Sequence, residues 1–117
     1  MKTRTMTDDQ VSYAIRHGEF GSDVICACGR VAVAMTQDWC PQWSGIRAWL
    51  NLIEEPTDLA VFELVYNASP RFPEFLDLKE NRWGNARIPY VRYYVDGKLV
   101  NESNYVTKEA FLACFER

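Results

Sequence analysis

The residue with the clearest chemical potential in this chain is Cys40, which stands where an apolar segment gives way to a helix. Residues 31–35 (VAVAM) are typical of a buried strand. Pro41 follows the cysteine, and proline is favoured at the first helical position because its missing N–H would be unpaired there. The Cys40 sulfur would then lie beside the free N–H groups and positive pole of that helix. Such a position favours the thiolate, which is the nucleophilic form of cysteine.

A plainer interpretation of the same segment stays open. Free cysteine is among the most buried residue types, so Cys40 could simply fill the start of a helix. Trp39 and Trp43 flank it. They could shape a substrate groove, but Trp43 also falls on the apolar stripe of the expected helix, where a core position is the ordinary explanation.

Composition and charge narrow the class of protein. The 117 residues are 48% hydrophobic with a net charge of −3, which predicts one globular domain spanning 1–117, with residues 1–6 as a flexible N-terminus. The negative charge argues against nucleic acid or an anionic membrane as partner. No apolar stretch approaches the roughly 20 residues of a membrane span, and no secretory signal follows Met1. We therefore expect a cytoplasmic protein whose four cysteines are reduced rather than a disulfide framework.

Periodicity and turn signals indicate the elements that must position Cys40. The predicted order is a helix after Thr7, strands at 24–27 and 31–35, a helix over 41–55, a strand at 59–66, a helical segment over 70–83, strands at 90–95 and 98–100, and a helix after Thr107. Asp96-Gly97 between the last two strands is a strong hairpin signal. This order predicts an α/β fold, with a mixed central sheet and helices on both faces.

Two motifs together resemble the thioredoxin-like family. The first is the strand leading into Trp-Cys at a helix start (31–43), and the second is WGNARIPY at 83–90, followed by a strand and Asp-Gly-Lys. In thioredoxins an aromatic-Gly pair precedes an Ile-Pro or Thr-Pro whose peptide bond is cis. The resemblance runs from about residue 7 to the end and implies a thioredoxin fold, with a cis Ile88–Pro89 bond lying against Cys40. A trans Pro89 that opens an edge strand is the plainer alternative.

The departures from that family bear most on function. Thioredoxins carry Cys-x-x-Cys, whereas Trp43 stands at the second cysteine position here. The Cys-Pro pair also resembles glutaredoxins, whose monothiol members act with the first cysteine alone. Ala34 replaces the buried aspartate that assists proton transfer in thioredoxins, and Glu63 aligns with the lysine that accompanies it. Asn104 aligns with a glycine expected after the hairpin.

A mixed disulfide on Cys40 would need another thiol to release it. Glutathione is one candidate co-substrate, and Cys26 and Cys28 are another, because residues two apart in a strand face the same side. Buried strand cysteines are the plainer interpretation of this pair. A metal site from both with His17 would supply only three ligands where a closed zinc site needs four, so we expect no metal. Cys114 is expected in the core, on the apolar face of the last helix.

Charged residues near the expected site have two interpretations each. Glu63 lies within an apolar strand, where an isolated carboxylate is costly to bury. It could accept a proton beneath Cys40, or it could point to an edge or pair with an arginine. Arg87 and Arg92 flank Pro89 and could place positive charge near the thiol, or they could be ordinary solvated arginines.

These observations predict a thiol–disulfide oxidoreductase that uses Cys40 as its single active-site cysteine. The supporting residues are expected to be Trp39, Pro41, Ile88, Pro89 and Glu63. Expected substrates are protein or small-molecule disulfides, including extended peptides, and no resident cofactor is expected. The alternative is a non-catalytic module that binds an extended peptide or a partner subunit through a cluster formed by Trp39, Trp43, Tyr90 and Tyr93.

Overall fold

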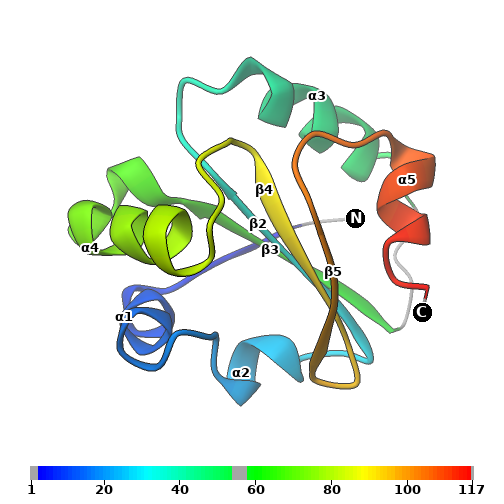
Figure 1. Ribbon diagram of the computed structural model, residues 1–117. Helices are drawn as coiled ribbons and strands as arrows, with labels where there is room; N and C mark the ends of the chain where they lie inside the picture. Colours follow the sequence, from blue (N-terminus) through cyan, green and yellow to red (C-terminus); the bar gives the residue numbers. More distant parts are fainter. Residues whose placement is uncertain (1–2, 54–57, 117) are drawn as a thin grey trace.

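The computed structural model describes residues 3–53 and 58–116, which are built around a five-stranded sheet (Figure 1). The strands are β1 (Arg4–Thr5), β2 (Arg30–Thr36), β3 (Leu59–Val65), β4 (Tyr90–Val95) and β5 (Lys98–Ser103). Their order across the sheet is β1-β3-β2-β4-β5. β1, β3 and β2 are parallel to one another, whereas β4 is antiparallel to both β2 and β5. The mixed sheet predicted from the sequence is confirmed.

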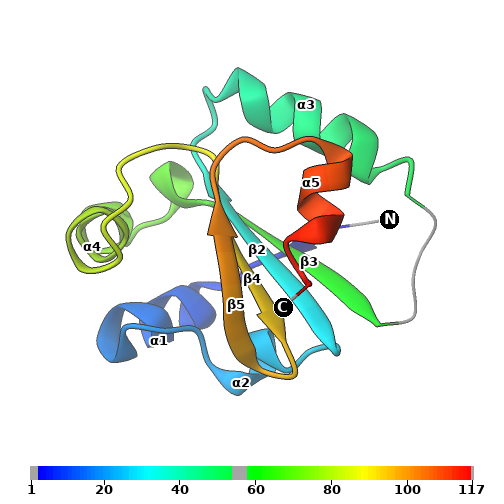
Figure 2. The same ribbon diagram turned by 45° about the vertical axis from the view of Figure 1, so that its right-hand side comes forward.

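Helices cover both faces of this sheet (Figures 1 and 2). The elements on one face are α1 (Asp8–His17), α2 (Ser22–Ile25), α4 (Phe72–Asp77) and the π-helix η2 (Leu78–Arg82), and we call it the α1 face. The elements on the other are α3 (Pro41–Leu50) and α5 (Lys108–Ala113), and we call it the α3 face. None of the described helices is long and apolar enough to cross a membrane.

Strand alternation divides the core between these faces. In β2, Val31, Val33 and Met35 join the cluster on the α1 face. Ala32 and Ala34, between them, join the cluster on the α3 face together with Cys40. This is the period of two expected for a strand buried on both sides.

Two local signals in the sequence are confirmed in detail. Thr7 caps α1, and its hydroxyl accepts a bond from the Gln10 amide while the Gln10 side chain accepts one from Thr7 N–H. At the hairpin, Asp96 and Gly97 have φ angles of 51° and 78°. These left-handed conformations are those of a type I′ turn, which explains the Asp-Gly pair.

Two predictions about the chain near its start are wrong. The short strand at 24–27 is instead the end of α2, because Gly21, Ser22 and Asp23 open a helical turn that buries Val24. Within the predicted flexible N-terminus at 1–6, residues 4 and 5 instead form β1, which pairs with the edge of β3, and residues 1 and 2 lie outside the described residues. The helix predicted over 41–55 ends earlier, because α3 ends at Leu50; residues 54 and 55 lie outside the described residues.

Candidate functional site

Cys40 lies at the carboxyl end of β2, where it forms the N-cap of α3 with Pro41 as the first helical residue. Its backbone N–H donates to the carbonyl of Gln37 at 3.1 Å. Its side chain makes no capping hydrogen bond, and the residue is 6% exposed among the apolar side chains of the α3 face. The position predicted for the thiol at a helix start is confirmed.

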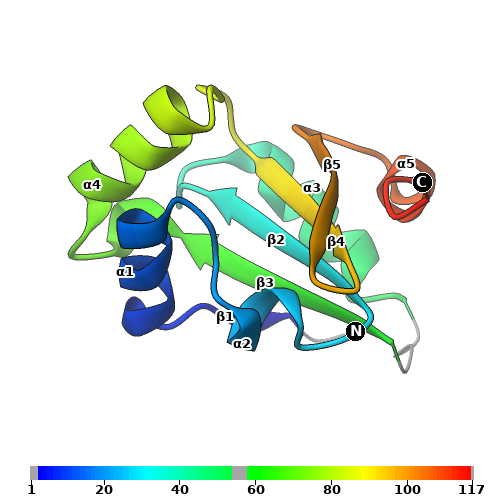
Figure 3. The ribbon, with the colours of Figure 1, turned by 60° about the horizontal axis from the view of Figure 1, so that its bottom comes forward.

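The segment before β4 lies at the same end of the sheet as Cys40. Met35, near the end of β2, is paired with Tyr90, at the start of β4. Figures 1, 2 and 3 agree in placing the start of α3 beside the segment that leads into β4. The Ile88–Pro89 bond in this segment is cis, and Ile88 packs against the cluster that contains Cys40.

Trp43, which stands in the position of a second cysteine, is buried and holds Glu63. Its indole N–H donates to Glu63 Oε1 at 2.8 Å, and the Thr3 hydroxyl donates to Oε2 at 3.1 Å. The guanidinium of Arg47 lies 3.8 Å from Oε1. Of the interpretations left open for Glu63, the carboxylate paired with an arginine is therefore the one in the structure. Its role as a proton acceptor for Cys40 stays a prediction.

A hydrogen-bonded network ties the loop before Cys40 to the end of β3. Gln37 is its centre: the side-chain amide donates to the Tyr66 hydroxyl at 3.2 Å, and its oxygen accepts from the Trp39 indole N–H at 2.6 Å. Asn67 accepts from the Asp38 backbone N–H at 3.0 Å and donates to its carboxylate at 2.8 Å. Sequence reasoning missed Gln37 and Tyr66. The available signal was that both follow neighbouring parallel strands, whose carboxyl ends meet at one edge.

The environment of Tyr66 keeps its hydroxyl protonated. Burial raises the pKa of Tyr66, the bond from Gln37 opposes that rise, and the negative charges of Glu80 and Cys40 add to it. The ring is 1% exposed and packs against those of Phe72 and Phe75.

The two cysteines proposed as resolving thiols lie at the other end of β2. Cys26 ends α2, and Cys28 is in the turn before Arg30, whereas Cys40 follows the end of the strand. Seven residues of β2 separate the two ends by roughly 20 Å. This geometry contradicts a resolving role within one molecule. The strand that would have aligned the pair is absent because that segment is helical.

The remaining cysteine predictions have mixed outcomes. All four cysteines lie within the described residues and are free thiols. Cys114 packs partly buried against the cluster of the α3 face, close to the predicted core position. No group of three or more metal-binding side chains was found among the described residues, so Cys26, Cys28 and His17 do not form one there.

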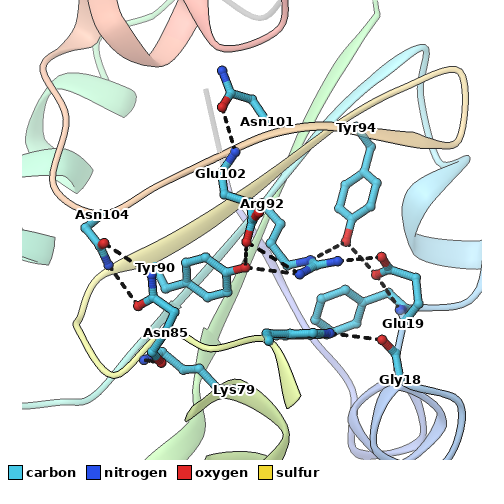
Figure 4. A network of polar contacts seen from close by, with 12 residues as sticks. Gly18, Glu19, Lys79, Asn85, Tyr90, Arg92, Tyr94, Asn101, Glu102 and Asn104 are labelled. Carbon is cyan, nitrogen blue, oxygen red and sulfur yellow. Dashed lines mark hydrogen bonds and ion pairs between the residues drawn. The ribbon is translucent and has the colours of Figure 1, made fainter. Parts of the chain in front are cut away.

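Arg92 does not lie near the thiol, contrary to expectation, because it points to the α1 face. Its guanidinium donates to the hydroxyls of Tyr94 (2.9 Å) and Tyr90 (3.0 Å) and to the Glu19 carboxylate (2.7 Å), as Figure 4 shows. It also lies 4.1 Å from the centre of the Trp83 ring. Arg92 is buried, whereas Arg87 is exposed.

The prediction that Trp39, Trp43, Tyr90 and Tyr93 form a binding surface is wrong. Trp43, Tyr90 and Tyr93 are at most 5% exposed, because each fills one of the two cores. Trp39 alone of the four is exposed, at 65%. A separate pocket of about 420 Å³ opens beside Arg47 and Glu63, and Cys40 is not among its lining residues.

The sequence matches no protein-family model and no curated protein. Among solved structures, the chain is similar to thioredoxin f from spinach chloroplast (short form), with 17% identity, a TM-score of 0.68, and coverage of 98% of this chain and 91% of that one. It is also similar to a point mutant of thioredoxin from Halobacterium salinarum NRC-1, with 21% identity, a TM-score of 0.58, and coverage of 78% and 74%. The chain therefore has a thioredoxin-like fold, in which a single cysteine caps the helix after β2.

Proposed function

We propose that this protein is a thiol–disulfide oxidoreductase that acts through one cysteine, Cys40. The observation that carries the proposal is the place of Cys40 as N-cap of the ten-residue helix α3, with Pro41 behind it. Unpaired N–H groups and the positive end of the helix dipole favour a thiolate there. Trp39, the residue before it in the chain, is 65% exposed and is available to contact a substrate.

The proposed exchange has two steps. The Cys40 thiolate attacks one sulfur of a substrate disulfide, a new S–S bond forms to Cys40, and the second substrate sulfur leaves as a thiolate. A thiolate from solution, of which glutathione is the candidate, then attacks this mixed disulfide and returns Cys40 to its thiolate form. Protein and small-molecule disulfides, including those in extended peptides, are the substrates we propose, in the reducing environment of a cytoplasm.

The surroundings of Cys40 support an external rather than an internal resolving thiol. Trp43 takes up the position three residues after Cys40 with a buried indole bound to Glu63. Cys26 and Cys28 lie at the opposite end of β2. A mixed disulfide on Cys40 therefore has no thiol three residues further along the chain, and neither Cys26 nor Cys28 lies beside it.

The proposal is tested with a glutathione-coupled disulfide-reduction assay and an insulin-reduction assay driven by dithiothreitol. We expect activity in the glutathione-coupled assay, its loss in Cys40→Ser, and full retention in Cys26→Ser. Activity that survives Cys40→Ser would overturn the assignment of the thiol. Activity only in the dithiothreitol assay would overturn the assignment of glutathione as the thiol that releases the mixed disulfide.

One observation favours a second candidate, a non-catalytic module that binds a peptide. Cys40 is only 6% exposed, while the neighbouring Trp39 is 65% exposed. An exposed tryptophan at the end of the sheet can act as an anchor for a partner. Inactivity of the wild-type chain in both assays would favour this candidate over the oxidoreductase.

A further inference from the structure

The pocket of about 420 Å³ beside Arg47 and Glu63 has no part in the exchange proposed for Cys40, which does not line it. Its lining comes from the end of β1, the start of α1, the middle of α3, the end of β3 and the segment 68–70. The volume lies within the roughly 300–1,000 Å³ that small-ligand sites occupy in proteins. The pocket is therefore large enough to hold a small organic molecule.

Arg47 brings to this pocket a positive charge whose donors are little used. Its guanidinium lies 3.8 Å from Glu63 Oε1, and its side chain is 55% exposed. The Glu63 oxygens accept their hydrogen bonds from the Trp43 indole and the Thr3 hydroxyl instead. A guanidinium carries five N–H donors in a fork that fits a carboxylate. Arg47 can therefore bind a carboxylate that a ligand brings.

Asp8 brings a negative charge from the start of α1. Its Oδ2 lies 3.4 Å from Arg71 Nε, and that buried nitrogen has no hydrogen-bond partner among the described residues, so the contact is an ion pair only. The Asp8 side chain is 50% exposed. Its carboxylate can therefore accept hydrogen bonds from an ammonium group of a ligand. Most other side chains of the lining are apolar, namely Met6, Val11, Leu64, Val65, Ala68 and Pro70.

The end of β3 offers main-chain groups to the same pocket. β1 pairs with β3 only as far as Thr5 and Glu63, and the Met6 N–H adds a bond to the Glu63 carbonyl at 3.0 Å. Alternate residues of a strand direct their main-chain groups to the same neighbour, so those of Val65 point to the side where β1 has ended. In the described part of the chain, no backbone bond from the segment after β1 reaches Val65. An extended peptide can pair with such an edge.

We propose that this pocket binds a short apolar peptide with free ends, its carboxylate at Arg47 and its ammonium group at Asp8. A ligand with only negative charge would meet the carboxylates of Asp8 and Glu63, and one with only positive charge would meet Arg47. The lining therefore favours a ligand that carries both charges on an apolar body. The edge at Val65 favours a peptide over a single amino acid, which has no peptide group to pair with it. This binding is separate from the proposed exchange and involves no covalent step.

The test is a titration of the isotopically labelled protein with the tripeptide Ala-Leu-Ala, followed by NMR. The same peptide with an acetylated N-terminus or an amidated C-terminus lacks one end charge, and free leucine has both charges but no peptide group. Asp8→Asn and Arg47→Gln each remove one charge from the pocket. Asp9→Asn is the matched control for the first, because Asp9 is the next residue of α1, is exposed and does not line the pocket. Arg87→Gln, at an exposed arginine outside the lining, is the control for the second.

We expect Ala-Leu-Ala to shift signals mainly within residues 5–8 and 63–70, and each blocked peptide to bind about three- to tenfold more weakly. Asp8→Asn should weaken binding of the free peptide by a similar factor and leave the acetylated peptide unaffected. Arg47→Gln should do the same for the free and the amidated peptide. Leucine should bind more weakly than the tripeptide, and both control variants should bind as the wild type does.

The proposal would be overturned by the absence of saturable shifts at these residues up to about 10 mM peptide. Equal binding of the free and blocked peptides would also overturn it, as would an effect of Asp9→Asn as large as that of Asp8→Asn. Leucine that binds as tightly as the tripeptide would show that the site takes a free amino acid. Should Arg47→Gln disturb the fold, the peptide series on the wild type still decides the question. Cys40→Ser should bind the peptide unchanged, so the result is independent of the proposed exchange activity.

Discussion

The two faces of the sheet bury polar groups in opposite ways. On the α1 face, Arg92 is buried with its donors used by two tyrosine hydroxyls and by Glu19 (Figure 4). On the α3 face, Cys40 is buried among apolar side chains with no hydrogen bond from its sulfur to cap the helix. The larger polar cluster is therefore the structural one. The candidate for chemistry is the buried thiol of Cys40, for which the described part of the chain shows no capping hydrogen bond.

The polar groups of the network on the α1 face form hydrogen bonds with one another. Glu19 accepts from Arg92, from the Tyr94 hydroxyl and from the Phe20 backbone N–H. The Tyr90 hydroxyl, which accepts from Arg92, donates to Glu102 on β5. A buried charge whose partners are all in place holds the elements around it in one arrangement. Here it joins the loop after α1 to β4 and β5.

The largest effect is expected from breaking that network. Arg92→Leu should lower the free energy of unfolding by about 3 kcal/mol, because Glu19 loses its cationic partner and two buried hydroxyls lose a donor. Urea denaturation followed by circular dichroism measures this. Arg87→Met, at an exposed arginine, is the control and should change stability by at most about 0.5 kcal/mol. Equal effects of the two variants would contradict the structural role given to the α1 face.

A second prediction concerns Lys79, which is fully buried on the α1 face and donates to the carbonyl of Asn85 at 2.9 Å. Burial lowers the pKa of Lys79 to about 8 despite the opposing charge of Glu80. Between pH 8 and about 10.4, the ordinary value for lysine, the unfolded chain therefore binds more protons than the folded one. The contribution of Lys79 to stability should therefore rise with pH in that window, by about 2 kcal/mol between pH 8 and 10.

The same denaturation series on Lys79→Met isolates this contribution, because the buried tyrosines titrate alike in both chains. The wild type should gain stability relative to the variant as the pH rises from 8 to 10. A difference between them that stays constant with pH would show that the amine is not protonated differently in the folded and unfolded states.

A third prediction tests a polar contact of the α3 face, the hydrogen bond between Trp43 and Glu63. Trp43→Phe retains an aromatic ring but removes the N–H bound to Glu63, and should cost about 1–2 kcal/mol. Thermal unfolding measures the loss. Glu63→Gln keeps an acceptor for the indole and should cost less. A larger loss from Glu63→Gln than from Trp43→Phe would mean that Arg47, rather than Trp43, is the partner that matters.

The smallest effect is expected where the α1 face meets the segment before β4. Asn104 donates to the Pro89 carbonyl at 3.0 Å and exchanges two hydrogen bonds with Asn85. Asn104→Ala should cost about 1 kcal/mol in urea denaturation. Hydrogen exchange at residues 85–88 should quicken while that of β2 stays unchanged. Unchanged exchange throughout would show that Asn104 does not restrain this segment.

The sequence predicts features that depend on residues close together in the chain better than features that depend on distant segments meeting in the fold. The capping box at Thr7, the Asp96-Gly97 turn and the Cys40-Pro41 helix start are local signals, and all three are confirmed. The strand β1 has only two residues and exists because β3 leaves an edge for it. No local pattern in residues 4 and 5 announces that pairing.

The sequence also did not predict which face of the sheet some side chains point to. Arg92 follows Pro89 closely in sequence, but a strand sends successive side chains to opposite faces, so its distance from Cys40 depends on register. Gln37 and Tyr66 are 29 residues apart, and they meet only because β2 and β3 are parallel neighbours. The exposed fractions of Trp43, Tyr90 and Tyr93 similarly depend on which helices cover each face.

The most direct test of the single-cysteine chemistry is the intact mass of the protein after brief treatment with a small aromatic disulfide, with the modified residue located by peptide mapping. We expect one mixed disulfide, on Cys40, that persists until glutathione is added and then disappears. A chain that stays unmodified at Cys40, or that releases the adduct by itself as a disulfide forms within the molecule, would contradict that chemistry.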